Sequence, residues 1–162
     1  MNLEQIENRI QDTDNGKSAI AEGGMVTAAF PEAVEAGVEM LERGGNAVDA
    51  ACATALALGV CEPAASGLGG QSYAMLHVGG KTVAVDGSSR SPSLAHRRAF
   101  THDEQLGLGH RATTIPTTVA VLGYLGRRYG RLPWADLLQP AIRIARNGYC
   151  ITAFQNSVQT LA

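Results

Sequence analysis

The first half of the chain places apolar side chains with the period of a helix. Val34, Val38 and Leu41 recur at intervals of four and three residues, and glutamates fill positions between them. This spacing predicts an amphipathic helix from Pro31 to Arg43, with the three apolar side chains facing inward. Proline suits the first turn of a helix, and the glycine pair that follows the helix supplies a stop.

The next stretch, from Ala47 to Val60, is rich in alanine and leucine on every face. Asn46 stands where an N-cap belongs, and Asp49 stands at the third helical position, near the positive end of the helix dipole. Fourteen helical residues span roughly 21 Å, which is short of the ~30 Å hydrocarbon core of a membrane. We therefore expect a buried helix that other elements cover all round.

Two strand-like runs follow, at residues 72–78 and 81–86, and Gly79-Gly80 between them predicts a hairpin. The other expected elements are a strand at residues 25–29, a short helix starting near Ser93, a helix from Pro116 to about Tyr129, and a helix from Trp134 to Asn147, stopped by Gly148. This order of elements indicates a layered α/β or α+β fold. Residues 1–23 hold few apolar anchors and are expected to form a polar lead-in.

Composition narrows the class of protein. Hydrophobic residues make up 45% of the 162 residues and charged residues 17%, which is typical of one folded domain rather than a disordered tail. The net charge is −2 and no basic stretch stands out, so a nucleic-acid partner is not expected. The N-terminus lacks the basic start and apolar run of a secretory signal, and cytoplasm is the expected compartment. The three cysteines, Cys52, Cys61 and Cys150, are interpreted as small apolar core residues.

Simple chemical motifs identify no catalytic site. The glycine loop Ser66–Gly70 follows a helix and precedes a strand, the reverse of a dinucleotide-binding loop, so it is interpreted as a tight turn. The four histidines lack metal-ligand spacing, so a metal site is not expected. The threonine pairs on either side of Pro116 are interpreted as hydroxyls that cap a helix start.

Three ordered stretches nevertheless resemble the large subunit of γ-glutamyltranspeptidases. The first joins Gly24-Met-Val-Thr-Ala28 to Leu41-Glu-Arg-Gly-Gly-Asn-Ala-Val-Asp-Ala-Ala51. The second is Glu62-Pro63 with Ser66-Gly-Leu-Gly-Gly70 and the aromatic Tyr73, and the third is Arg128-Tyr-Gly-Arg-Leu-Pro-Trp134 with Gln139-Pro-Ala-Ile-Arg-Ile-Ala-Arg-Asn-Gly148. Together they cover residues 23–152 in the family's order and spacing, and residues 24–162 are identified as a segment of that subunit.

The resemblance implies an Ntn-hydrolase-like α+β fold, a four-layer αββα sandwich that is incomplete in this chain. It also implies a proenzyme that cleaves itself into two subunits and uses no metal or organic cofactor. The N-terminal threonine of the small subunit is then the nucleophile, with its own α-amine as base. The family takes the γ-glutamyl group from glutathione or a related small amide and gives it to water or an amino acid.

Two departures from the family pattern bear on the site. The nucleophile lies beyond the matched region, so no threonine of this chain is assigned a catalytic role, and the partner that carries it would be the remainder of the proenzyme. In the family, the substrate-binding arginine lies in a segment that corresponds to Asp86-Gly-Ser-Ser-Arg-Ser-Pro92 of this chain. In this chain, Ser88 stands at the position of that arginine. Arg90, two residues on, and Ser88 are the candidate substrate-binding residues.

Three interpretations of Arg90 remain open at this stage. It reaches the substrate carboxylate from a neighbouring position, or the substrate is not a normal γ-glutamyl compound, or Arg90 is a solvated loop residue. A bidentate arginine–carboxylate contact is not readily replaced by another residue type. A rival function from another class is a catalytically silent, truncated homologue that acts as an interaction module.

Overall fold

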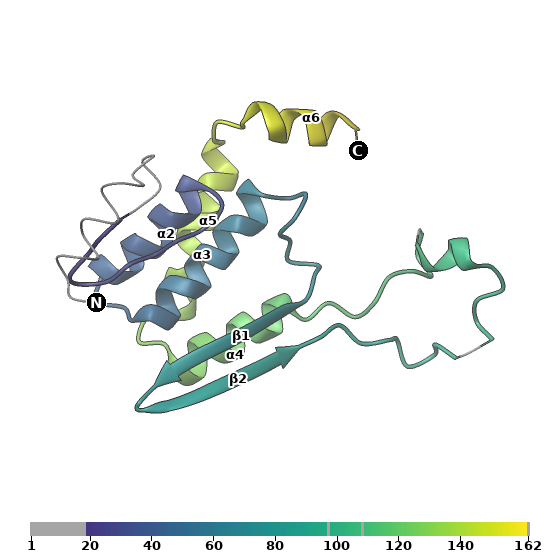
Figure 1. Cartoon of the computed structure of the whole chain (residues 1–162), viewed down its shortest axis with the longest axis horizontal. Coiled ribbons are helices and arrows are strands. Elements are labelled where there is room, and N and C mark those ends of the chain that lie inside the picture. The colour runs from purple at the N-terminus through teal and green to yellow at the C-terminus, as the bar shows by residue number, and fades with distance from the viewer. Residues whose placement is uncertain (1–18, 97, 108, 162) are drawn as a thin grey trace, which may run out of the picture.

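The structure is a computed structural model that describes residues 19–96, 98–107 and 109–161; residues 1–18 of the expected lead-in lie outside this part. The described elements are α2 (Pro31–Glu42), α3 (Ala47–Cys61), β1 (Ser72–Val78), β2 (Lys81–Gly87), a 3-10 helix η1 (Asp103–Leu106), α4 (Thr118–Tyr129), α5 (Trp134–Asn147) and α6 (Ala153–Leu161) (Figure 1). Helices α2, α3, α4 and α5 and the β1–β2 hairpin form the body. Between β2 and α4 the chain projects away from this body as a long excursion, residues 88–117, which we call the arm.

Helix α3 is the centre of the body and contacts α2, α4 and α5. Its start forms the expected cap: the Asn46 side chain accepts from the backbone N–H groups of Val48 (2.8 Å) and Asp49 (3.2 Å), and Asp49 accepts from Asn46 N (2.8 Å). The Asn46 amide also donates to the carbonyl of Tyr129 (2.7 Å) at the end of α4. Through Asn46 and Tyr129, this cap brings together the first and third of the three stretches that resemble the family.

The buried face of α2 differs from the predicted one. Ala33, Ala36, Gly37 and Met40 are buried, whereas Val38 is 37% exposed. The small residues let α2 lie close against α3: a Cβ on Gly37 would collide with Thr54 of that helix. The predicted helix is confirmed, but Val34 and Leu41 are only half-buried and Val38 is exposed. The predicted face was therefore partly wrong, because it weighted side-chain size, while the close approach of two helices selects small side chains.

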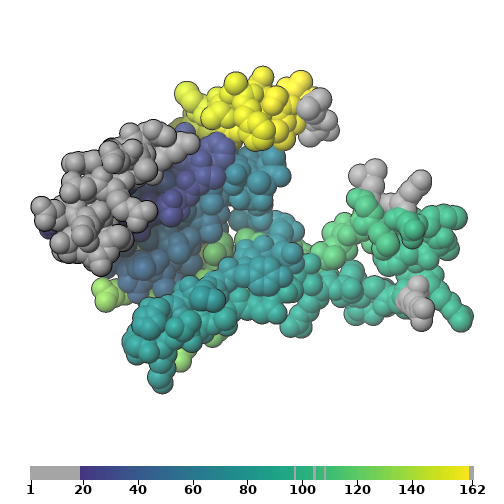
Figure 2. All heavy atoms as spheres, in the orientation of Figure 1, coloured from purple at the N-terminus to yellow at the C-terminus, as the bar shows by residue number. Residues whose placement is uncertain are grey.

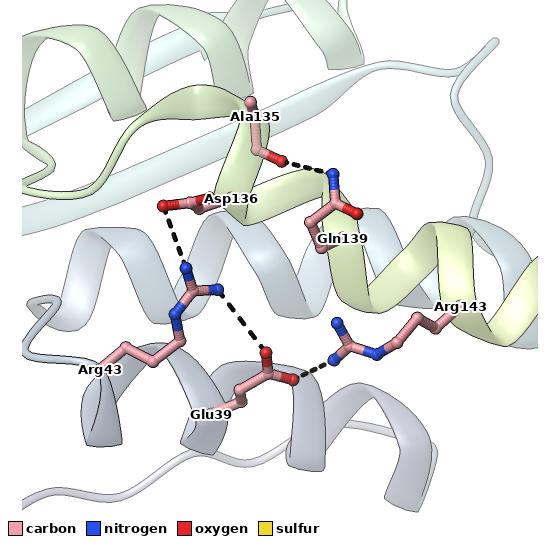
Figure 3. A network of polar contacts seen from close by, with 6 residues as sticks. All are labelled: Glu39, Arg43, Ala135, Asp136, Gln139 and Arg143. Carbon is pink, nitrogen blue, oxygen red and sulfur yellow. Dashed lines mark hydrogen bonds and ion pairs between the residues drawn. The ribbon is translucent and has the colours of Figure 1, made fainter.

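Charged side chains also join α2 to α5, outside the contact between α2 and α3 (Figure 3). Arg43 lies 3.0 Å from Asp136 and 3.7 Å from Glu39, and Arg143 also pairs with Glu39. These exposed pairs connect the two helices without belonging to the core.

The hairpin forms with the expected turn. Tyr73 pairs with Asp86 and Val78 with Lys81 in an antiparallel register, and Gly79 and Gly80 have φ values of 59° and 74° at the turn. One face of the sheet packs on α4 through Ala74, Leu76 and Val85. The other face and both edges are open among the described residues, because the described sheet has only these two strands.

Three other expectations were wrong. Residues 25–29 form no strand; Val26 instead lies beside Gly37 of α2, where no strand is available to pair with it. No helix starts at Ser93, and the arm contains η1 instead. The Thr117 hydroxyl does not cap α4 but donates to the carbonyl of Gly87, which ties the helix start to the hairpin.

Helix α3 is covered on most of its surface, though Ala51 is exposed. Cys52 and Cys61 are buried core residues as expected, whereas Cys150 is exposed; all three are free thiols. The described helices include none that combines the length and the apolar character needed to cross a membrane. The sequence analysis did not predict α6 at the C-terminus. This helix begins with a reciprocal cap between Thr152 and Gln155.

Candidate functional site

The candidate site lies where β2 ends and the arm begins. Gly87 is buried there, and a Cβ at this position would collide with the carbonyl of Ser72 and a methyl of Val121. Only glycine allows the strand to pass this close to β1 and α4. With the Thr117 hydroxyl on its carbonyl, Gly87 fixes the point from which the next residues project.

A chain of hydroxyls follows directly. The Ser88 Oγ and backbone N–H both donate to Asp86 Oδ1, at 2.6 and 2.9 Å, and the Tyr73 hydroxyl lies 2.9 Å from Ser88 Oγ. Since the single hydroxyl proton of Ser88 points to Asp86, Tyr73 is the donor in the last pair. These bonds from Ser88, with a further contribution from Arg90, hold the pKa of Asp86 below its usual range.

Arg90 is anchored by its backbone. Its carbonyl accepts from the N–H of Ile115 (2.8 Å), which forms a two-residue bridge across the base of the arm. The neighbouring Ser89 N–H donates to the Gln71 side chain at 2.9 Å. In the described part of the chain, the Arg90 guanidinium has no ion pair or hydrogen bond, and the side chain is exposed.

The two predicted substrate-binding residues line one pocket of about 350 Å³. Asp86, Ser88 and Arg90 form its polar side, and Thr117 lies at the start of α4. The opposite wall is apolar and comes from β2 and α4, with Val85, Ala120, Val121 and Tyr124. The pocket could thus hold a small molecule with one polar or charged end and one apolar end.

The arrangement does not resemble a metal site. Among residues 19–96, 98–107 and 109–161, no three histidine, cysteine or carboxylate side chains gather closely enough to hold an ion. His77 lies on β1 and contacts Thr82 (3.1 Å), away from the pocket.

Sequence reasoning missed Tyr73, Gln71 and Thr117 as parts of this site. Tyr73 and Gln71 come from the opposite strand and its approach, so their role depends on the hairpin register rather than on a local motif. The register could have revealed Tyr73, since pairing Val78 with Lys81 places it opposite Asp86.

Comparisons with known proteins agree on one family. The family model described as gamma-glutamyltranspeptidase matches residues 33–160. The glutathione hydrolase proenzyme of Pseudomonas aeruginosa is 37% identical over 138 residues, which cover 82% of this chain and 25% of that protein. An acylase ACY 1 proenzyme of Pseudomonas sp. (strain SE83) is 34% identical over 167 residues, with 94% of this chain and 30% of that protein covered.

A solved structure gives the same result. The Helicobacter pylori γ-glutamyltranspeptidase aligns with a TM-score of 0.84 at 34% identity, over 90% of this chain and 44% of that chain. The chain spans about a quarter of the length of the curated relatives it matches. The expected fold class, a partial α+β segment of the Ntn-hydrolase type, is therefore confirmed.

Proposed function

The chain belongs to the γ-glutamyltranspeptidase family, and we propose that it forms the N-terminal large-subunit segment of a divergent amide hydrolase or transferase. The observation that carries the proposal is the match of the family model over residues 33–160. The nucleophile of this enzyme is an N-terminal threonine on the remainder of the proenzyme. Its hydroxyl attacks the amide carbonyl while its α-amine takes the hydroxyl proton. The α-amine passes this proton to the amine of the donor, which leaves, and water or an amino acid then takes the acyl group from the threonine ester.

In this scheme Arg90 binds the carboxylate at the acyl end of the donor. Support comes from its exposed guanidinium, which has no partner among the described residues, and from its place on the polar side of the pocket. Ser88 acts differently from the arginine usual at its position: its proton is donated to Asp86, so it shapes the loop that presents Arg90.

A second candidate is an acylase whose donor has no carboxylate at the acyl end. The commitment of the Ser88 proton to Asp86 and the apolar wall of Val121 and Tyr124 favour such a donor. The similarity to an acylase proenzyme is consistent with it. The alternative from another class, a catalytically silent homologue that serves as an interaction module, makes no use of the pocket.

The proposed partner is the remainder of the proenzyme, and the proposed compartment is the cytoplasm. The hairpin supports the first proposal: its outer face leaves Tyr73 64% and Met75 78% exposed, and both of its edges are open among the described residues. Further strands laid on these edges would enlarge the sheet. The three free cysteines are consistent with a reducing compartment.

The test uses a chimeric proenzyme in which residues 24–162 replace the matching part of the Pseudomonas aeruginosa relative. Three 4-nitroanilide donors separate the candidates: γ-glutamyl, glutaryl, which keeps the terminal carboxylate but lacks the amine, and butyryl, which lacks both. We expect Arg90→Ala to raise KM for the first two by roughly 10- to 100-fold, the value of a charged hydrogen bond, and to leave butyryl hydrolysis unchanged. Arg146→Ala, a substitution of an exposed arginine on α5 outside the arm, is the control.

Each other outcome has a defined meaning. Preference for the butyryl donor, with no effect of Arg90→Ala, would favour the acylase. A chimera that assembles but hydrolyses none of the three donors would contradict both enzymatic candidates and leave the silent homologue.

A further inference from the structure

Among the described residues, the arm is joined to the body at its base. The Arg90–Ile115 bridge closes its two ends, and beyond that point the described arm residues contribute nothing to the buried core of the body. Its outer part has its own contacts, such as the Arg111 guanidinium on the carbonyl of Ala99 (2.9 Å). Figure 2 shows this part as a separate lobe beside the rest of the molecule.

The lobe curves around a hollow of about 580 Å³. Every lining residue lies between Ser91 and Thr114, so no side chain of the body enters the space. The walls are largely apolar, with Pro92, Phe100 and Leu106 among them, and His110 and Arg111 add cationic or polar groups. Leu106 is 58% exposed toward this space and solvent.

A lobe of this kind is poorly stabilised by itself. Fixing the backbone opposes folding by about 1–2 kcal/mol per residue, and burial of apolar surface is the main compensation. The arm has little such burial, and its apolar residues line a hollow that is open to solvent. A group that enters the hollow would bury these residues and supply the missing compensation.

Charge indicates the chemistry of that group. Residues 88–117 hold four arginines and two acidic residues, whereas the rest of the chain has nine basic and thirteen acidic residues. Among the described residues, no ion pair joins the arm to the acidic body. Among the described arm residues, Arg98 and Arg111 are thus available to an acidic partner.

We propose that the arm is a docking element whose hollow receives an apolar segment with at least one acidic residue from the remainder of the proenzyme. The proposal rests on the proposed function, which supplies that remainder: about three quarters of the curated relatives' length lies outside this chain. It adds the place on this chain where the remainder inserts. The arm and its occupant order each other on association.

The test measures assembly rather than turnover. This chain is co-expressed with the part of the Pseudomonas aeruginosa proenzyme outside the matched 138 residues, and the dissociation constant is measured. We expect Leu106→Ser to weaken association roughly tenfold or more, as for a buried apolar anchor. Leu94→Ser is the matched control, because Leu94 is an arm leucine that is 88% exposed and does not line the hollow; we expect less than a twofold effect.

Hydrogen exchange gives a second readout. Amides of residues 91–96, 98–107 and 109–114 should exchange at least about tenfold more slowly in the complex than in the chain alone, because the occupant protects the arm from local opening. Unchanged exchange, or equal affinity of wild type and Leu106→Ser, would overturn the docking proposal. Self-association of this chain that Leu106→Ser abolishes would assign the hollow to a second copy and also overturn it.

The two proposals fail separately. Assembly with a protected arm but without hydrolysis of any donor would leave the docking element standing and contradict the proposed activity. If the two pieces do not associate at all, both the docking element and the proposed partner are wrong.

Discussion

A single buried carboxylate, that of Asp49, holds the start of α3 to the turn that precedes α5. Besides the N–H of Asn46, it accepts from the backbone N–H groups of Arg131 (2.9 and 3.1 Å) and Leu132 (3.2 Å). Its side chain is fully buried, and no arginine or lysine pairs with it among the described residues. Backbone donors alone therefore satisfy this charge.

We expect Asp49→Asn to lower the free energy of unfolding by about 2–4 kcal/mol. The variant keeps the shape but turns an oxygen into a donor that faces other donors, and buried polar groups left unpaired are expensive. Urea unfolding of the 162-residue chain measures the change. Glu35→Gln, an exposed change on α2, should lie within about 0.5 kcal/mol of wild type, and equal loss in both variants would contradict the role of Asp49.

The Asp86 carboxyl permits a test of the site by titration. Its pKa is lowered in the folded chain, so its contribution to stability is present above the ordinary value near 3.8 and is lost as the pH falls through the folded pKa. Ser88→Ala removes the main cause, and we expect the pKa of Asp86 to rise toward the ordinary value. Carbon-13 NMR of the carboxyl measures it. Ser89→Ala is the matched control, since Ser89 uses only its backbone N–H.

Thiol reactivity reports on the core at the same scale. Burial, with the nearby Asp49 carboxylate, raises the pKa of the Cys52 thiol to about 11, and burial also raises the pKa of Cys61. At pH 8 we expect an aromatic disulfide reagent to label only the exposed Cys150 in the native chain and all three thiols in denaturant. Labelling of the Cys150→Ser variant under native conditions at the wild-type rate would show that the core around α3 is open.

At the scale of elements, local signals predicted what local contacts stabilise. The hairpin and the helix from Trp134 to Asn147 were confirmed, because turn glycines and helix stops act within a few residues. The helix α6 was missed although Thr152 and Gln155 have the spacing of a capping box. The predicted strand at residues 25–29 failed because strands need partners that sequence periodicity does not supply.

The candidate site likewise depends on contacts between residues that are far apart in the sequence. Ser88 and Arg90 were selected as candidates only through the family resemblance, since a serine and an arginine in a loop have no distinctive local pattern. Their shared pocket depends on α4, whose start lies close to the end of β2 only in the folded chain.

The contact between α2 and α3 reverses the usual effect of a glycine substitution. Alanine inside a helix is normally more stable than glycine by about 1 kcal/mol. At Gly37, however, the added methyl would collide with Thr54 and Val26, so we expect Gly37→Ala to destabilise the chain by about 1–3 kcal/mol. Thermal unfolding decides the sign. In α3, a methyl at Gly59 would make only ordinary contacts with Leu68, the nearest at 3.4 Å, so Gly59→Ala should be neutral or stabilising.

At the scale of the whole molecule, the described part leaves large apolar side chains on its surface. Tyr73 and Met75 cover the outer face of the hairpin, Leu106 lies on the arm, and Phe154 lies on α6. Apolar surface spread over three separate elements is typical of a chain that a larger partner covers.

The isolated 162-residue chain should therefore bind an apolar dye. It should hydrolyse no γ-glutamyl anilide, because the proposed nucleophile lies on the remainder of the proenzyme. We expect the double variant Met75→Thr and Phe154→Ser to lower dye fluorescence clearly, because these side chains are 78% and 76% exposed. Val119→Thr, at a less exposed position on α4 (46%), is the control and should change the fluorescence less. A stable monomer without dye binding would contradict the view that a partner covers these surfaces.

The end of α3 has a consequence for synthesis on the ribosome. Its last carbonyls, those of Val60 and Cys61, accept from Tyr149 (3.2 Å) and from the Gln155 side chain. The latter pair is separated by 94 positions, and ribosomes add about 5–20 residues per second. The C-terminal turn of α3 thus waits on the order of 5–20 s after its own translation for these donors. During that interval the nascent chain exposes this helix end to chaperones and proteases.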